Sequence, residues 1–170
     1  MANVDSPHGF ISIGARDGRP GYFRNYNHVA ADTVAIGFND LVQTVAAGTD
    51  VAQAVAGGPF LGISHANGAV STLYTVPTEL ITSDLIMEAQ TDTSLATADT
   101  GLNADVIVAA RNATTGISAM EINGGTEATT STLDLRLLRL APYVDNASGT
   151  NSRWFVLCND VAMEDLKAGE

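Results

Sequence analysis

A run of alternating side chains in the last third of the chain constrains the fold most. Residues 133–140 read Leu-Asp-Leu-Arg-Leu-Leu-Arg-Leu, with an apolar residue at every second position up to Leu137. Successive side chains of a β-strand point to opposite faces of its sheet, so this pattern predicts a half-buried strand. The apolar parity then changes to Leu138 and Leu140, which favours a β-bulge or a strand end that is covered on both faces.

The next strand is expected to be buried on both faces. A loop at 145–152 leads into residues 153–159, which read Arg-Trp-Phe-Val-Leu-Cys-Asn. Continuous apolar character over this length predicts a strand without a solvent-facing side. Cys158 is the only cysteine, so an intramolecular disulfide is excluded and we expect a buried, inert thiol.

Short apolar segments separated by turn residues recur along most of the chain. They predict further strands at 33–37, 41–45, 51–56, 60–64, 71–76, 85–89, 105–110 and 118–122. Asn67-Gly68 is the strongest hairpin signal, because both residues tolerate the positive φ of a type I′ turn. Within 118–122, Met120 and Ile122 are expected to face inward and Glu121 outward. This spacing predicts an all-β fold, a single β-barrel or sandwich-like domain, with a short helix as an alternative at 97–103 or at the C-terminus.

The first thirty residues differ from the rest, because glycine and proline interrupt their aromatic and arginine residues. We therefore predict an extended N-terminal arm over 1–30, with a short strand at 10–13, and a β-barrel domain over 31–170. Ordering ~15 residues costs roughly 15–30 kcal/mol of backbone entropy. Burying Tyr22 and Phe23 would return only about 4–6 kcal/mol each. The arm therefore needs main-chain hydrogen bonds to its own domain, a sister subunit or the sheet edge of another protein.

Length and charge restrict the class of protein. The 170 residues favour one domain, and they contain no run of about 18 apolar residues that could span a membrane. The start lacks the features of a signal peptide, so we expect synthesis in a cytoplasm. The net charge is -11, and between 25 and 110 there are nine Asp and Glu residues but no Lys or Arg. This acidity argues against nucleic acid and anionic lipid as partners.

Catalytic and metal-binding patterns are weak, so we predict neither an enzyme nor a cofactor or metal site. Ser64 and His65 are neighbours on a predicted strand and should point to opposite faces, which prevents a nucleophile–base pair. His8, His28 and His65 lack the spacing that holds a metal on one element. A glycine-rich phosphate loop is also absent, because no lysine follows Gly57-Gly58.

Several segments resemble a family of small capsid decoration (cement) proteins of tailed bacteriophages. They are Ser-Pro-His-Gly-Phe at 6–10 with the arm to Tyr26, Ile-Gly-Phe-Asn-Asp-Leu-Val at 36–42, Ala-Gly-Gly-Pro-Phe-Leu-Gly-Ile at 56–63, Thr-Gly-Leu-Asn-Ala-Asp at 100–105, Gly-Ile-Ser-Ala-Met-Glu-Ile at 116–122, and 132–140 with Asp145-Asn146 and Trp-Phe-Val-Leu at 154–157. The resemblance implies a β-barrel on the outer capsid surface of a virion. It further implies the major capsid protein as partner and association with itself, as a homotrimer or alternatively a dimer.

The arm supplies the candidate contact residues. We expect Arg16, Arg19, Tyr22, Phe23 and Arg24 to dock on capsid protein or on an adjacent subunit. A structural component of the tail or neck is an alternative in the same setting. A small-molecule-binding β-barrel is the alternative from a different class.

Overall fold

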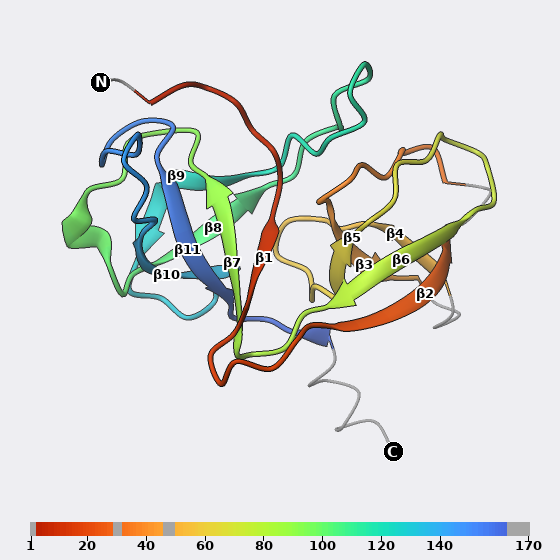
Figure 1. The fold of residues 1–170 in the computed structure, drawn as a ribbon, viewed down its shortest axis with the longest axis horizontal. Coiled ribbons are helices and arrows are strands. Elements are labelled where there is room, and N and C mark those ends of the chain that lie inside the picture. The colour runs from red at the N-terminus through yellow and green to blue at the C-terminus, as the bar shows by residue number, and fades with distance from the viewer. Residues whose placement is uncertain (1–2, 29–31, 46–49, 163–170) are drawn as a thin grey trace.

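The computed structural model describes residues 3–28, 32–45 and 50–162, and it confirms the all-β prediction. A closed five-stranded barrel and a six-stranded antiparallel sheet lie side by side (Figure 1). The barrel is built from β2 (Tyr22–His28), β3 (Leu41–Thr44), β4 (Asp50–Gln53), β5 (Gly62–Ser64) and β6 (Thr75–Leu80). The sheet is built from β1 (Ile11–Ala15), β7 (Leu85–Gln90), β8 (Asn103–Ile107), β9 (Glu121–Ala128), β10 (Leu135–Leu140) and β11 (Arg153–Cys158).

The six-stranded sheet has the order β1-β7-β11-β10-β8-β9 and curls strongly. An isolated bridge joins Thr91, just after β7, to Ile122 in β9, so the two sides of the sheet approach each other. β11 lies in the middle, and its residues from Trp154 to Cys158 are all buried, as predicted. A short 3-10 turn, η1 (Thr97–Asp99), lies at the first of the two places where a short helix was the alternative; the C-terminal alternative falls almost wholly outside the described residues.

Residues 3–28, the described part of the predicted arm, supply strands to both halves. β1 pairs with β7 at the edge of the sheet, and β2 pairs with β6 and β4 in the barrel. The main-chain hydrogen bonds of β1 and β2 therefore go to their own domain. The other two expected alternatives were a sister subunit and the sheet edge of another protein. Phe10 is fully buried, and Gly9 precedes it with φ 72; a Cβ at Gly9 would lie 2.3 Å from the carbonyl oxygen of Asn39. Only glycine fits where residue 9 passes this close to the Asn39 backbone.

The predicted bulge in β10 is confirmed. Leu137 pairs with Val156, and the next paired residue is Arg139, opposite Phe155, so Leu138 is the inserted residue. The bulge keeps Leu135, Leu137 and Leu140 against the core and leaves Arg136 and Arg139 exposed.

Three local predictions are wrong. The strand predicted at 71–76 is misplaced, because only its last two residues belong to a strand, β6 (Thr75–Leu80). Residues 33–37 form no strand, because their backbone groups bond elsewhere: the Val34 and Gly37 N–H groups donate to the Asp32 and Asp40 carboxylates at 2.9 and 2.6 Å. Asn67-Gly68 is not a type I′ turn, since neither residue has positive φ. The Gly68 N–H instead donates to the Ile36 carbonyl at 3.1 Å, within a longer loop.

The segment predicted as a strand at 118–122 lies mostly before β9, which begins at Glu121. Its expected pattern of inward and outward side chains is confirmed. Met120 and Ile122 are fully buried, whereas Glu121 is half-buried.

The hydrophobic core is continuous between the two halves. One cluster combines Leu41, Phe60 and Ile63 of the barrel half with Met87 and Trp154 of the sheet half. A second cluster fills the barrel; it contains Tyr26, Ile36, Val42, Val51, Leu61 and Val76. The barrel and the sheet therefore share the first cluster, and the second belongs to the barrel half.

Candidate docking surface

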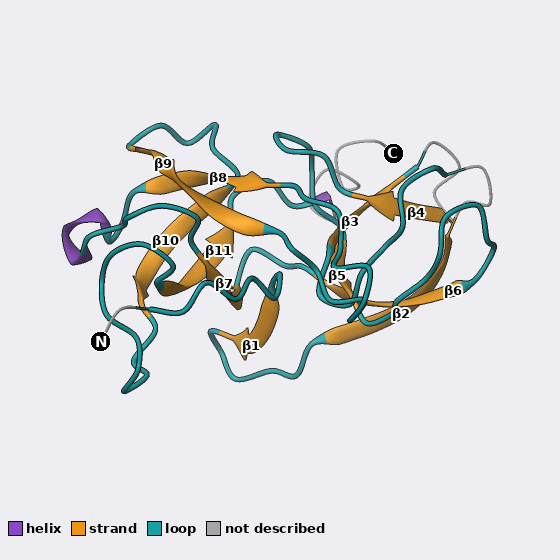
Figure 2. Ribbon diagram, turned by 90° about the horizontal axis from the view of Figure 1, so that it is seen from above, coloured by secondary structure: helices purple, strands orange, loops and turns teal. Residues whose placement is uncertain are grey.

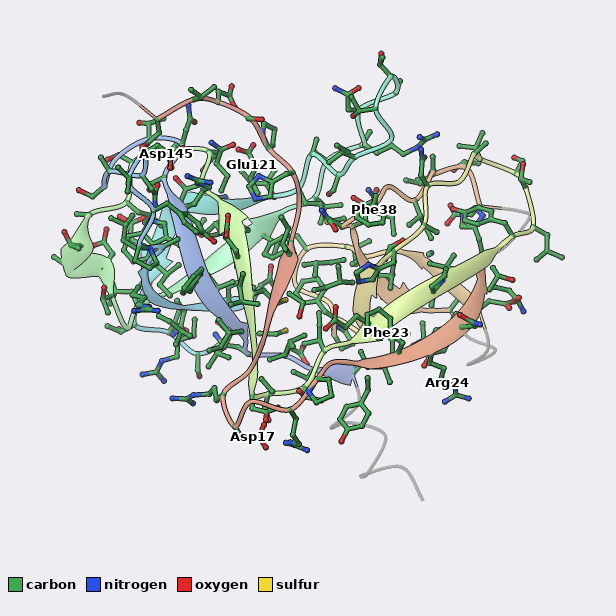
Figure 3. All side chains as sticks on the ribbon, in the orientation of Figure 1. Asp17, Phe23, Arg24, Phe38, Glu121 and Asp145 are labelled. Atoms are coloured by element: carbon green, nitrogen blue, oxygen red, sulfur yellow. The ribbon has the colours of Figure 1, made fainter. Side chains whose placement is uncertain are left out.

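Three exposed apolar side chains and a half-buried histidine, from separate parts of the chain, form a group on the barrel half. Phe23, Phe38 and Ile117 are 61%, 41% and 38% exposed, and together with His65 they are called the aromatic patch below. The His65 ring centroid lies 5.0 Å from that of Phe23 and 5.4 Å from that of Phe38. Figure 3 labels Phe38 above Phe23 on the barrel half. Exposed contiguous aromatic surface of this kind is typical of protein–protein contacts.

Barrel closure and one bridge bring the patch together. Phe23 lies in β2, His65 follows β5, and Phe38 pairs with Ile117 in an isolated parallel bridge. The Phe38 N–H donates to the Gly116 carbonyl at 2.9 Å, which fixes the loop before β9 beside the barrel. The patch is thus held by main-chain hydrogen bonds and is preorganised for contact.

A buried carboxylate supports the patch from below. Glu79 in β6 is 5% exposed; its Oε2 lies 3.2 Å from His65 Nε2, and its Oε1 accepts a hydrogen bond of 2.7 Å from the Ser12 hydroxyl. A carboxylate only accepts, so Nε2 of His65 carries the proton in this contact. Gly21 makes the room, because a Cβ there would lie 1.9 Å from Glu79 Oε1. Glu79 therefore orients the His65 ring between the two phenylalanines.

The structure separates the predicted contact residues. Tyr22 and Phe23 are exposed at the start of β2, and the Arg24 guanidinium lies 5.4 Å from the Tyr26 ring. Arg19 is held by ion pairs with Asp17 and, at 3.0 Å, Asp84. Arg16 lies away from the patch, in a depression that it shares with Arg136.

Of the predicted residues, only Phe23 belongs to the patch. The sequence analysis missed Phe38, His65 and Ile117, because barrel closure and the Phe38–Ile117 bridge bring them together. The one available signal was Phe38 itself, a large aromatic side chain next to the turn residues Asn39-Asp40.

A second group of polar side chains fastens the N-terminal segment to the sheet. His8 Nε2 lies 3.5 Å from Glu88 Oε1, and the Tyr143 hydroxyl donates to the other Glu88 oxygen. The Arg153 guanidinium lies 4.4 Å from the Tyr143 ring. The neighbouring Glu88 carboxylate raises the pKa of His8. Burial acts to raise the pKa of Glu88, but the contacts with His8 and Tyr143 outweigh it and lower that pKa. This group borders a depression of about 260 Å³.

Two buried carboxylates tie loops to strands. Asp134 accepts the N–H groups of Gly57 at 3.0 Å and Val106 at 2.8 Å, so it joins the barrel half to the sheet. Asp40 accepts the Gly37 N–H and, at 3.0 Å, the Gln53 amide. Burial raises the pKa of both carboxyls. Their hydrogen bonds are all to groups of the fold itself, which indicates a structural role.

The residues considered for catalysis lie apart. Ser64 is buried and its hydroxyl bonds to Ala66, whereas His65 is at the surface. Within 3–28, 32–45 and 50–162, no three His, Cys, Asp or Glu side chains come close enough to hold a metal ion. No helix in this described part of the chain has the length and apolar character to cross a membrane.

Comparisons of the chain with family models, curated proteins and solved structures find no match.

Proposed function

We propose that this chain is a capsid decoration protein of a tailed bacteriophage, which adheres to the outer surface of the head and reinforces the shell. The observation that carries the proposal is the aromatic patch, an exposed apolar surface held by main-chain hydrogen bonds and by Glu79. The resemblance of the sequence to decoration proteins suggests the partner, the major capsid protein. Further copies of the chain would be the second partner.

The size of the patch sets the strength of one contact. Covering the exposed parts of Phe23, Phe38 and Ile117 would return roughly 5–7 kcal/mol at about 25 cal/mol per Å². Association costs about 4–15 kcal/mol in lost freedom, so one copy would bind weakly by this patch alone. Linked copies would bind much more strongly, because each later contact is intramolecular. A coat of many copies therefore suits a patch of this size.

The charge of the chain is compatible with a position outside the head. A net charge of -11 is repelled by packaged DNA. Long-range attraction to the shell is not required, because exposed charges are screened within about 8 Å at physiological salt. Apolar contact at the patch would act at short range instead.

The test is co-sedimentation with heads assembled from the major capsid protein of the same phage. Deleting residues 1–24 is unsuitable, because that segment contains β1 and the buried Phe10. We expect the double substitution Phe23→Ser and Phe38→Ser to weaken head binding about tenfold or more, since most of the apolar contact is lost.

The matched control replaces two exposed apolar residues elsewhere, Leu73→Ser and Val144→Ser, which are 67% and 108% exposed in the wild type. This control should bind heads like the wild type. Unchanged binding by the patch variant would exclude the patch as the contact, and a wild type that does not bind heads would contradict the proposed function.

A second experiment distinguishes the head from the tail or neck as the place of this protein. It locates a labelled antibody on intact particles by negative-stain microscopy.

A further inference from the structure

The outer face of the six-stranded sheet carries opposite charges on different strands. Arg136 and Arg139 point outward from β10, because the bulge places both opposite outward residues of β11, Leu157 and Phe155. On β8 and β9, Val106 pairs with the fully buried Ile122 and faces the core, so their neighbours Asp105 and Glu121 point outward. Because the sheet curls, β8 and β9 lie along one side and β10 and β11 beneath them (Figure 2). The arginines of β10 and the carboxylates of β8 and β9 therefore face different directions.

Three arginines form the positive region, called the arginine face. Arg16 and Arg136 line a common depression of about 390 Å³ together with Leu138 and Leu157. The Arg139 guanidinium lies 5.1 Å from the Phe155 ring centroid. Stacking on an aromatic ring leaves the N–H edge of a guanidinium free to bind a carboxylate through two hydrogen bonds.

The arginine face has no carboxylate partner within the described part of the chain. There, ion pairs of arginine involve only Arg19, with Asp17 and Asp84, and Arg153, with Asp145. Among the described residues, three of the eight Lys and Arg of the chain thus gather on one face without an ion pair, although the net charge is -11. Their arrangement suits an acidic protein surface.

The chain itself offers such a surface at the other side of the sheet. Asp5 and Asp92 lie near enough to Glu121, at the start of β9, to act on its charge, and Asp105 lies on the neighbouring strand β8; these four residues are called the acidic edge. Burial, followed by repulsion from Asp5 and Asp92, raises the pKa of Glu121. Figure 3 labels Glu121 at this edge. The acidic edge would gain from cations that a neighbouring molecule supplies.

We propose that copies of this chain associate head to tail, with the acidic edge of one copy on the arginine face of the next. The inference deepens the proposed function, on whose self-association it rests. Two different patches meet, so the contact is heterologous and closes into a ring or continues as a chain of copies. Exposed ion pairs contribute little singly, so association in solution is weak, and copies held close together on a shell would associate more strongly.

The test measures self-association by sedimentation velocity, without heads, over a series of protein concentrations. The dissociation constant should rise about tenfold between about 0.1 M and about 1 M NaCl, as the Debye length falls from about 10 Å to about 3 Å. Arg136→Glu with Arg139→Glu should weaken association about tenfold or more, and so should Asp105→Arg with Glu121→Arg. In an equimolar mixture of the two variants, the unchanged acidic edge of the arginine variant can bind the unchanged arginine face of the other variant. This contact should have the wild-type affinity. Arg24→Glu, which reverses one arginine on the barrel, should leave association unchanged.

Other outcomes would overturn the proposal. They are a wild type that stays monomeric at every concentration and salt, a doubly reversed arginine variant that associates like the wild type, or a mixture that does not associate. If reversing the charges of the arginines abolished head binding and left self-association unchanged, the arginine face would contact the shell instead of another copy. Head binding is measured separately, so a wild type that associates with itself but does not bind heads would contradict only the proposed function.

Discussion

Among single residues, His8 shows how charge fastens the N-terminal segment. Its ring lies against Glu88, and further along the segment Gln90 donates to the Val4 carbonyl at 2.7 Å and accepts from the Ser6 N–H at 3.0 Å. The sequence analysis treated His8 as one of three scattered histidines. The pairing was not predictable, because residues 8 and 88 meet only after β1 has docked beside β7.

The His8–Glu88 pair should make stability depend on pH. The pKa of His8 is raised above 6.5, so its contribution is present in full below about pH 6.5 and is lost as the pH rises through the higher folded-state value. The pKa of Glu88 is lowered below 4.5, so its contribution is lost only as the pH falls through that lowered value. We expect the free energy of unfolding to decrease by about 0.5–1 kcal/mol from about pH 6 to about pH 8.5.

Urea unfolding at a series of pH values measures this change, and His8→Gln is its control. The difference between wild type and variant should shrink as the pH rises. Two parallel pH curves would show that the pair contributes nothing.

Among the strands, the sequence pattern predicted β10 but did not indicate β2. Alternation predicted β10 and its bulge, because the inward side of that strand is leucine throughout. In β2 only Tyr26 and His28 are buried, so the strand carries almost no apolar pattern and residues 1–30 read as an arm. Its pairing with β6 and β4, rather than its side chains, places β2 in the barrel.

Removing the bulge of β10 should be tolerated. Deleting Leu138 leaves Leu-Arg-Leu-Arg-Leu, which keeps leucine inward and Arg136 and Arg139 outward in regular pairing. We expect cooperative unfolding with a loss of about 1–2 kcal/mol, measured by chemical denaturation.

The matched control for this deletion removes Ile122 from β9. It would move Asn123 toward the position of a fully buried residue, and we expect a loss of more than about 4 kcal/mol. Equal losses in the two variants would show that Leu138 is not a simple insertion.

For the whole molecule, the shared core should make the two halves unfold together. Besides the apolar cluster, the Phe60 carbonyl accepts the Ala162 N–H at 3.0 Å, and Asp134 binds the Gly57 N–H. We expect one calorimetric transition whose van't Hoff and calorimetric enthalpies agree, although the strands form two separate sheets. Two resolved transitions would show that the halves are independent.

Local side-chain pattern alone determined the all-β class, the buried central strand, the bulge in β10 and the inward positions of Met120 and Ile122. Such patterns report the period of a strand and the burial of its faces, which depend on near neighbours in the chain. Tertiary structure decided the division into a barrel and a sheet, the place of β1 in the sheet and of β2 in the barrel, the aromatic patch and the segregation of charge around the curled sheet. These features depend on pairings between distant segments, such as Phe38 with Ile117 and β1 with β7, and no local period encodes which distant partners meet.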